Sequence, residues 1–285
     1  MTTRLRRGRR EDASACGVIA FEAFKAIADA HSYPPDFPSE QVATEVLSML
    51  LVHPAFYSVV AEQDGRVVGS NFLDERSTIA GVGPITVTPS LQNGGVGRAL
   101  MEDVLARAKE RKAPGIRLVQ AAYHRRSLAL YAKLGFDIRE TLSCMQGAPI
   151  RLPAQGYAVR LGSEGDVAAC NAVCARVHGH DRAGEVTDAI RLGTLSVVEH
   201  DGRITGYTTG VALFAHAVGE SNNDLKALIG AATEYLGPGF LLPTRNTELF
   251  RWCLEHRLRL VQQMTLMTIG LYNEPAGAYL PSILY

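Results

Sequence analysis

Apolar and polar residues alternate on both sides of an Asp-Gly pair at two places in the chain. The segment SVVAEQDGRVVG begins at Ser58, and the segment SVVEHDGRITG begins at Ser196. Alternating apolar residues predict strands with one buried face, and Asp-Gly favours the two-residue turn of a β-hairpin. We therefore expect one hairpin in each half of the chain.

A helical pattern follows the first hairpin, over residues 96–109. Apolar residues recur there at helical spacing, and charged residues fill most of the other positions. The β-branched run at 85–87 predicts a strand that ends before Pro89, and a Pro-Gly pair stops the helix before a second strand begins at Ile116. The predicted order is strand, glycine-rich turn, amphipathic helix, strand.

The two hairpins belong to a longer internal repeat. Residues 5–16 (LRRGRREDASAC) match residues 159–170 (VRLGSEGDVAAC) without a gap. A third match pairs LALYAKLGF with TELFRWCLEHRL and places Tyr131 opposite Phe250. Because all three matches occur in the same order, we expect two copies of one α/β unit, of which the second is shorter and decayed.

Length, charge and composition agree with two globular domains. The 285 residues are about twice the length of one typical domain, and the Pro- and Gly-containing stretch 148–157 predicts the boundary. Lys plus Arg number 29, as do Asp plus Glu, so no net charge attracts nucleic acid or an anionic membrane. The sequence shows neither a membrane-spanning run nor a secretory signal pattern, and its five cysteines form no C-x-x-C pair. We expect a cytoplasmic protein with buried, reduced thiols.

The glycine-rich turn carries the clearest candidate chemistry. Gly94, Gly95 and Gly97 allow a tight turn that exposes backbone N–H groups at a helix N-terminus, where the helix dipole also favours an anion. No Lys-Ser or Lys-Thr follows, which excludes a P-loop, and Leu100 stands where a dinucleotide fold needs its third glycine. The spacing that fits is Q-x-x-G-x-G, which starts at Gln92. This pattern indicates a phosphate site, and a plain strand-to-helix turn is the alternative.

Two motifs together resemble the GNAT superfamily of acyl-CoA-dependent N-acyltransferases. One is the loop at 92–97, and the other is HRRSLALYAKLGFDI, a short helix that bears Tyr131 and ends in Leu-Gly-Phe. The resemblance implies an α/β fold (an α+β mixed sheet) of two tandem GNAT-like domains, each a central twisted mixed β-sheet flanked by helices. It implies a catalytic domain that binds acetyl-CoA at 1–147, and a degenerate domain with a structural and substrate-pocket role at 157–285.

In this family the glycine loop cradles the pyrophosphate of coenzyme A. The family usually has an asparagine seven residues before the tyrosine, and this chain has His124 there, which can still donate one hydrogen bond. The second copy has no such loop, so we expect it to bind no coenzyme. The coenzyme-binding residues that the resemblance implies are Ile85, Thr86, Val87, Gln92, Asn93, Gly94, Gly95, Val96, Gly97, Arg98, Ala99, His124, Ser127 and Tyr131.

Transfer of an acetyl group from a thioester to a primary amine sets three chemical needs. A backbone N–H near Val87 should stabilise the oxyanion, and Tyr131 is the candidate general acid for the departing thiolate, with a buried core tyrosine as the alternative. The general base is left unassigned, since a relayed water would serve. The resemblance implies acetyl-CoA as co-substrate and a small-molecule or peptide amine as acceptor, with no metal, nucleic acid or membrane as partner; a homodimer is compatible with the sequence.

Two other classes of protein are alternatives to this enzyme. One is a catalytically idle acyl-CoA sensor or interaction module, which would need the loop but not the tyrosine hydroxyl. The other is a nucleotide-binding regulator, which the failed P-loop and dinucleotide matches disfavour.

Candidate acceptor residues lie in two segments of the first copy. The proline-rich segment 31–40 predicts a stiff loop, which overhangs the acceptor site in the family; a plain connector is the alternative. Two acidic residues precede the central strand, with exposed turn charges as the alternative. The candidates are His31, Tyr33, Phe37, Asp74 and Glu75.

Two further clusters are interpreted as structural. The arginines at 4–10 predict an edge strand rather than a nucleic-acid arm, since no aromatic residues lie among them. His178, His180 and Asp181 are interpreted as a polar loop, because no second group of ligands at metal-site spacing accompanies them.

Overall fold

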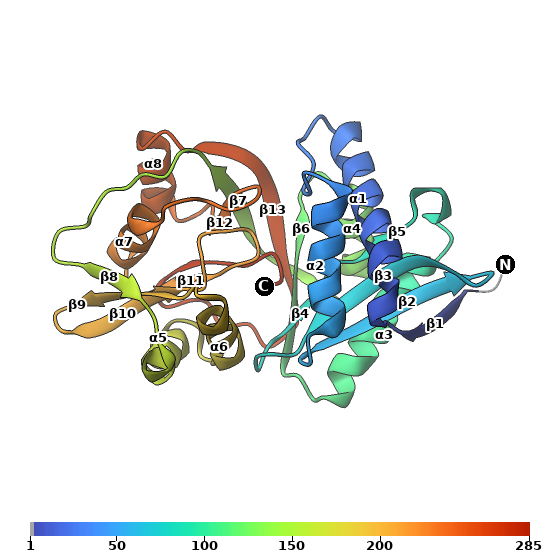
Figure 1. The fold of residues 1–285 in the computed structure, drawn as a ribbon, viewed down its shortest axis with the longest axis horizontal. Coiled ribbons are helices and arrows are strands. Elements are labelled where there is room, and N and C mark those ends of the chain that lie inside the picture. The colour runs from blue at the N-terminus through green and yellow to red at the C-terminus, as the bar shows by residue number, and fades with distance from the viewer. Residues whose placement is uncertain (1–2) are drawn as a thin grey trace.

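The chain folds into two lobes, each built mainly from one copy of the repeat (Figure 1). The structure is a computed structural model and describes residues 3–285. The first copy contains β1 (Arg4–Arg7), α1 (Ala13–Ala30), α2 (Glu40–Val52), β2 (Phe56–Gln63), β3 (Arg66–Asp74), β4 (Ala80–Val82), β5 (Thr86–Val87), α3 (Val96–Glu110), β6 (Gly115–Ala121), α4 (Arg125–Lys133) and β7 (Asp137–Gln146). The second contains β8 (Ala158–Leu161), α5 (Val167–His178), α6 (Ala183–Leu192), β9 (Ser196–His200), β10 (Arg203–Thr208), β11 (Ala217–Gly219), α7 (Asn222–Ala231), β12 (Phe240–Pro243), α8 (Thr247–Glu255), β13 (Arg259–Gly270) and β14 (Ala278–Leu280).

The predicted alternation in the first hairpin places neighbouring residues on opposite faces of a sheet. Val59 packs with the apolar residues of α3 and α4, whereas Val60 packs with those of α1 and α2. The Asp-Gly turns of both hairpins form as predicted, since Asp64 and Asp201 adopt φ of 49° and 51°. The sheet of the first lobe is therefore buried on both faces, and not on one face as the alternation predicts.

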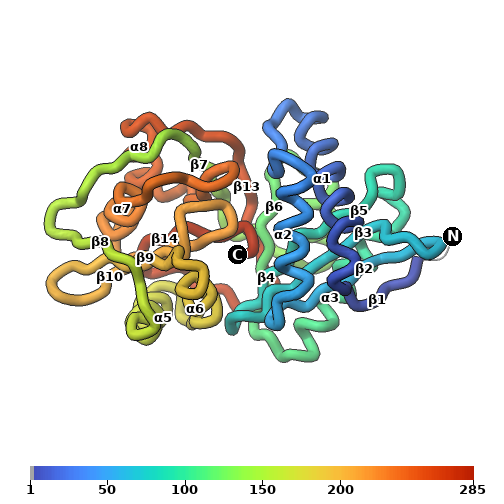
Figure 2. The backbone as a smooth tube through the Cα atoms, in the orientation of Figure 1, coloured from blue at the N-terminus to red at the C-terminus, as the bar shows by residue number. Residues whose placement is uncertain are grey.

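The two copies exchange strands where the lobes meet. The order of the larger sheet is β1-β2-β3-β4-β6-β13-β7-β12, and β5 pairs with β3. Strand β13 of the second copy pairs antiparallel with β6 along one edge and with β7 along the other, and β7 then pairs with β12. Figure 2 shows β6, β13 and β7 at this junction. Each copy thus contributes one strand that separates two strands of the other.

The expected tandem α/β architecture is confirmed. The larger sheet is mixed, because β4 and β6 pair in parallel. The smaller sheet has the order β14-β11-β10-β9-β8, and all of its pairs are antiparallel. The second sheet therefore differs from the mixed sheet expected for each copy, because β14 pairs with β11 and β12 joins the larger sheet.

The same ion-pair cluster recurs in both copies and supports the internal repeat. Arg6 donates to both oxygens of Asp12 at 2.7 Å and, through Nε, to Glu62 at 2.8 Å. Arg160 donates to both oxygens of Asp166 at 2.8 Å and, through Nε, to Glu199 at 2.9 Å. In each copy the arginine lies on the edge strand, and the aspartate comes directly before the first long helix.

The third sequence match is wrong by three residues. His124 and Asn246 each cap the N-terminus of a nine-residue helix, α4 and α8, through a side chain that accepts a backbone N–H. Counting from these caps places Cys253, rather than Phe250, opposite Tyr131. The hydrogen bonds after the helices agree, because Phe136 N donates to Tyr131 O and Leu258 N donates to Cys253 O, both at 3.0 Å.

Three other expectations have clear outcomes. The arginine-rich N-terminal segment forms edge strand β1, and all five cysteines are buried and unpaired, as predicted. The predicted loop forms at residues 179–181, but His178 ends α5, and both it and His180 are buried against Tyr285. Within residues 3–285 no group of His, Cys, Asp and Glu could hold a metal ion, and none of the helices there is long and apolar enough to cross a membrane.

Candidate active site

The larger sheet opens between β5 and β6. Strand β4 pairs with β6 only at Ala80 and Gly81, and β5 pairs with β3 instead of continuing along β6. A cavity of about 150 Å³ lies at this opening. Its lining residues in the first copy are Ala23, Phe24, Ile27, Asp36, Phe37, Val82, Gly83, Pro84, Ile85, Thr86, Val87, Gln92, Leu118, Val119, Gln120, Ala121, Tyr123, His124, Ser127 and Tyr131.

The backbone of Val87 faces this opening. Thr88 N donates to Val68 O of β3 at 2.9 Å. In an antiparallel pair alternate residues bond to the same neighbour, so the N–H and C=O of Val87 point away from β3. The Val87 carbonyl accepts a hydrogen bond from Gln92 Nε2 at 3.2 Å, in agreement with this direction. The Val87 N–H is therefore placed to donate to a group bound beside β5.

The glycine-rich loop lies next to the cavity, at the start of α3. Asn93 and Gly95 adopt φ of 70° and 86°, which turns the chain tightly into the helix. Arg126 of α4 donates to Gln92 Oε1 at 2.8 Å and to Asn93 Oδ1 at 3.3 Å, so α4 holds the loop. The first N–H groups of α3 have no carbonyl partner within the helix, and the loop from Gln92 to Ala99 has no acidic residue. The loop therefore fits a phosphate group.

His124 and Ser127 form the N-terminal end of α4 beside the cavity. Ser127 N donates to His124 Nδ1 at 3.3 Å, and Ser127 Oγ donates to the His124 carbonyl at 2.9 Å. Burial lowers the pKa of His124, so the ring is neutral at neutral pH. A neutral ring whose Nδ1 accepts carries its proton on Nε2. His124 can therefore donate one hydrogen bond from Nε2, as an asparagine amide could.

Tyr131 lines the same cavity from α4. It is 6% exposed, and its ring packs edge-on against Phe136 with 6.2 Å between ring centroids. Burial raises the pKa of the Tyr131 phenol, so the hydroxyl stays protonated at neutral pH and acts as a donor.

The proline-rich segment lies over the cavity, but its three predicted residues take different places. Phe37 is buried, lines the cavity and packs edge-on against Phe24 at 5.7 Å. Tyr33 stacks on Tyr123, with 4.3 Å between ring centroids. His31 is exposed and lies 5.2 Å from the Tyr123 ring, outside the cavity lining. Phe37 alone of the three reaches the cavity.

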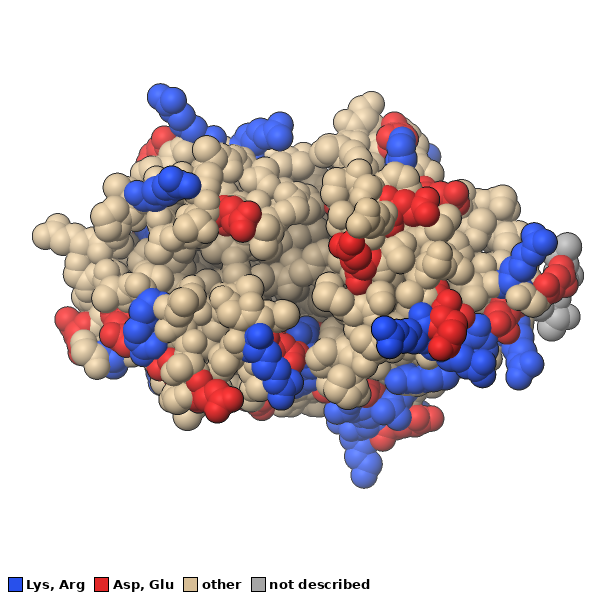
Figure 3. Space-filling view, viewed as in Figure 1, with Lys and Arg blue, Asp and Glu red and all other residues tan. Residues whose placement is uncertain are grey.

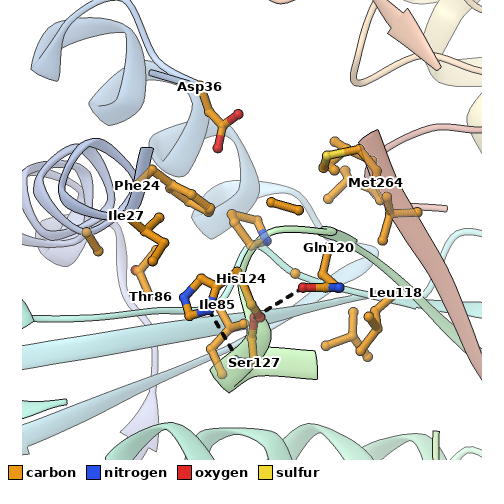
Figure 4. Close-up of a pocket in the computed structure, with 18 of the residues that line it drawn as sticks. Phe24, Ile27, Asp36, Ile85, Thr86, Leu118, Gln120, His124, Ser127 and Met264 are labelled. Carbon is orange, nitrogen blue, oxygen red and sulfur yellow. Dashed lines mark hydrogen bonds between the residues drawn. The ribbon is translucent and has the colours of Figure 1, made fainter. Parts of the chain in front are cut away.

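Asp36, which the sequence argument did not single out, also lines the cavity. Figure 4 shows its carboxylate pointing between Phe24 and Met264. Gln262 Nε2 donates to Asp36 Oδ1 at 3.1 Å, and burial raises the pKa of Asp36. The only sequence signal for it was a carboxylate inside an aromatic, proline-rich loop.

Asp74 and Glu75 lie outside this cavity. Asp74 is buried at the end of β3 in an ion pair with Arg76 at 2.6 Å. Glu75 forms ion pairs with Arg107 at 2.8 Å and Arg111 at 2.6 Å. The structure therefore does not bring them together with Tyr131, and they are not the exposed turn charges of the alternative interpretation either.

The second copy closes one side of the cavity. Met264 reaches the cavity from the exchanged strand β13. The other lining residues of this copy lie in the loop after β10 and just before the C-terminal Tyr285. On the face drawn in Figure 3 the surface between the lobes is hollowed and largely free of charged side chains. The lining residues from this copy are Leu213, Phe214, Met264, Ile283 and Leu284.

The start of α7 in the second copy differs from the glycine loop that precedes α3. The Asp224 carboxylate accepts hydrogen bonds from Ser221 N and Ser221 Oγ, each at 2.8 Å, and from the Thr205 hydroxyl. Asp224 is buried, and its backbone N–H donates to Ser221 Oγ at 3.4 Å, so Ser221 and Asp224 form a capping box at this helix end. A second anion at this helix end would meet like charge.

The family follows from comparison with known proteins. Residues 23–136 match the model of the Acetyltransferase (GNAT) family. The matched residues lie in the first copy, which is therefore a domain of this family of N-acetyltransferases, whose members use acetyl-CoA. A comparison with curated proteins gave no match.

Solved structures show that the tandem fold extends over nearly the whole chain. A putative acetyltransferase from Pyrococcus horikoshii has a TM-score of 0.74 at 16% identity, covering 97% of this chain and 94% of its own. A GCN5-related N-acetyltransferase from Sphaerobacter thermophilus has a TM-score of 0.61 at 13% identity, covering 95% and 96%. A tandem GNAT protein from the clavulanic acid biosynthesis pathway has a TM-score of 0.57 at 15% identity, covering 94% and 98%. This chain thus has the tandem fold of these proteins over nearly its whole length.

Proposed function

We propose that this chain transfers the acetyl group of acetyl-CoA to the primary amine of a small-molecule or peptide acceptor, and that only the first copy binds the coenzyme. One observation carries the proposal. Val87, Gln92 at the start of the glycine loop, and Tyr131 all line the same opening between β5 and β6.

The residues at this opening suit the parts of the coenzyme. The pyrophosphate would lie on the N–H groups that start α3, where the helix dipole favours an anion. His124 Nε2 would donate to an amide oxygen of the pantetheine arm, and the acetyl carbonyl would accept from Val87 N–H. No acidic residue opposes the phosphates in the loop from Gln92 to Ala99.

Each proton and electron pair in the proposed transfer has a defined donor and acceptor. The acceptor ammonium loses one proton to water, and the lone pair of its nitrogen forms the new C–N bond to the acetyl carbonyl carbon. The nitrogen then carries a positive charge and loses a second proton to water. The Val87 N–H stabilises the negative charge that develops on the carbonyl oxygen. The C–S bond breaks with its electron pair on sulfur, and the Tyr131 hydroxyl protonates that sulfur and regains a proton from solvent. The products are an N-acetylated amine and the free thiol of coenzyme A.

A broad amine screen with labelled acetyl-CoA tests the proposal. We expect label to move to one class of primary amine. Stoichiometric coenzyme binding without transfer to any amine would instead identify an idle acyl-CoA sensor.

Calorimetric titration should find one coenzyme site per chain, and Gly94→Asp should weaken that site about tenfold or more. Gly94 is exposed, has a negative φ, and has room for a side chain, so the variant should fold. Like charges a few ångström apart repel by more than about 1 kcal/mol at an effective dielectric constant near 20.

Gly94→Asn has nearly the same shape without the charge and should bind coenzyme almost as wild type. Asn222→Asp adds a carboxylate at the start of α7 and should leave the titration unchanged. Two equivalent sites, or equal effects at the two helices, would contradict the assignment of the coenzyme to the first copy.

Replacing His124 should separate its helix-capping role from its coenzyme contact. His124→Ala removes the cap, which should cost about 1 kcal/mol of stability, and should weaken coenzyme binding about threefold to tenfold through a lost hydrogen bond. His124→Asn keeps both an acceptor for Ser127 N and an N–H donor, so stability and affinity should stay near wild type. Thermal denaturation and titration measure the two effects. Equal affinity of both variants for coenzyme would show that His124 is only a cap.

A further inference from the structure

The cavity that we assign to transfer contains one charged side chain. Among its described lining residues, Asp36 is the only Asp, Glu, Lys or Arg. Asp36 forms no ion pair within residues 3–285, and its hydrogen-bond partner there is the neutral amide of Gln262. An unpaired carboxylate in a partly desolvated cavity is costly and is stabilised by a cation.

Unpartnered oxygen atoms lie close to this carboxylate. Gln262 is buried, and its Oε1 has no hydrogen-bond partner although its Nε2 donates to Asp36. The Tyr123 hydroxyl is also buried without a partner. Burial and the nearby Asp36 carboxylate both raise the pKa of Tyr123. A primary ammonium has three N–H donors. Asp36 and Tyr123 line the cavity and Gln262 does not, so the Asp36 carboxylate is the acceptor that faces such a group, and the enclosed Tyr123 hydroxyl lies near it.

The rest of the acceptor side of the cavity is apolar. Phe24 and Phe37 come from the first copy, and Leu213, Phe214 and Met264 come from the second. The cavity has about 150 Å³ in all and would hold the acetyl end of the coenzyme as well, so the part left for the acceptor body is small. The described lining residues include no cation to pair with an acceptor carboxylate, and no second anion to pair with a second ammonium. An acceptor with either of these extra charges would bury that charge unpaired, at a cost of several kcal/mol.

We propose that Asp36 selects the acceptor, which is a small primary amine with a single positive charge and an apolar, aliphatic or aromatic body. The transfer step of this inference rests on the proposed function, whereas the binding of the amine by Asp36 does not. It disfavours free amino acids, which carry a carboxylate, and polyamines, which carry more than one ammonium group.

Binding of two probes of equal shape tests the inference without turnover. Titration of 2-phenylethylamine and of 2-phenylethanol into the enzyme with coenzyme A should show that wild type prefers the amine by about tenfold to 100-fold, the range for a hydrogen bond to a charged group. Asp36→Asn keeps the shape and a partner for Gln262 and should abolish that preference. Tyr123→Phe should reduce it by a smaller factor. Glu40→Gln removes an exposed charge at the start of α2 and should change nothing.

Acetylation assays with the same amine then separate the two proposals. We expect kcat/KM for 2-phenylethylamine to exceed that for phenylalanine and for 1,4-diaminobutane, and to fall about tenfold to 100-fold in Asp36→Asn. A preference for the diamine or the amino acid, or an unchanged amine preference in Asp36→Asn, would overturn the role of Asp36. Asp36-dependent amine binding with no acetylation would support that role and overturn the proposed transferase activity.

Discussion

Tyr131→Phe is expected to lower turnover about 10²-fold to 10⁴-fold while the fold and the affinity for coenzyme stay nearly unchanged. The ring is buried, and burial raises the pKa of its phenol, so the hydroxyl is a proton donor at neutral pH. A phenylalanine ring fills the same space against Phe136 and lacks only that hydroxyl. The lost group is therefore the one that the departing sulfur needs.

Tyr57→Phe is the matched control for this variant. Tyr57 packs at the edge of the same apolar core, lies outside the cavity lining and donates to Asp103 at 2.8 Å. Losing this bond should cost about 1 kcal/mol of stability and leave turnover unchanged. Steady-state kinetics with an identified amine, together with coenzyme titration, measure both variants. Wild-type turnover in Tyr131→Phe would show that Tyr131 is only a core residue and that water protonates the thiolate.

Elements with strong local signals could be predicted from the sequence. Helix α3 begins at Val96 after the glycine turn and β6 begins at Gly115, within a residue of the expected positions. The two Asp-Gly hairpins also form where they are predicted. In each case neighbours along the chain determine the conformation through glycine, proline or period-two burial.

The wrong repeat match at Phe250 has a physical reason. A helix repeats every 3.6 residues, so a shift of three positions keeps apolar residues on the same face. Phe250 and Cys253 therefore lie on one face of α8, and apolar spacing alone could not distinguish them. The caps at His124 and Asn246 establish the alignment in the structure.

The strand exchange and the acceptor residues depend on contacts between distant parts of the chain. Both β7 and β13 are apolar strands that could pair with β6, and no local pattern says which copy supplies the neighbour. Asp36 acquires a partner only from Gln262 on the exchanged strand. Asp74 and Glu75 were candidate acceptor residues in the sequence, but Asp74 pairs with the nearby Arg76, and Glu75 pairs with Arg107 and Arg111 from the end of α3.

Removing residues 157–285 is expected to abolish soluble, monomeric protein. The deletion takes away β13, which pairs with β6 from Ala121 to Gly115, and it takes away both partners of β7. Leu142 and Met145 of β7 are fully buried in the whole chain and would be exposed in the fragment. Unpaired edges and exposed apolar side chains favour aggregation. Soluble yield and size-exclusion chromatography of residues 1–156 measure the outcome.

A point variant tests the same strand in the full chain. Leu266→Pro removes a ladder hydrogen bond from β13, which is flanked on both sides, and should destabilise the protein by about 3 kcal/mol or more. Leu161→Pro, at the exposed end of edge strand β8, is the control and should cost much less. Chemical denaturation compares the two variants.

The two copies exchange strands symmetrically, so the oligomeric state of the deleted fragment is also informative. Strands β7 and β13 pair with each other and hold equivalent places, each between two strands of the opposite copy. Two fragments could therefore exchange β7 strands and rebuild the junction as a dimer. A soluble fragment that is dimeric would support the need for an exchanged strand. A monomeric fragment with full acetylation activity would show instead that the first copy can close its own sheet, and that the second copy is dispensable for both the fold and the cavity.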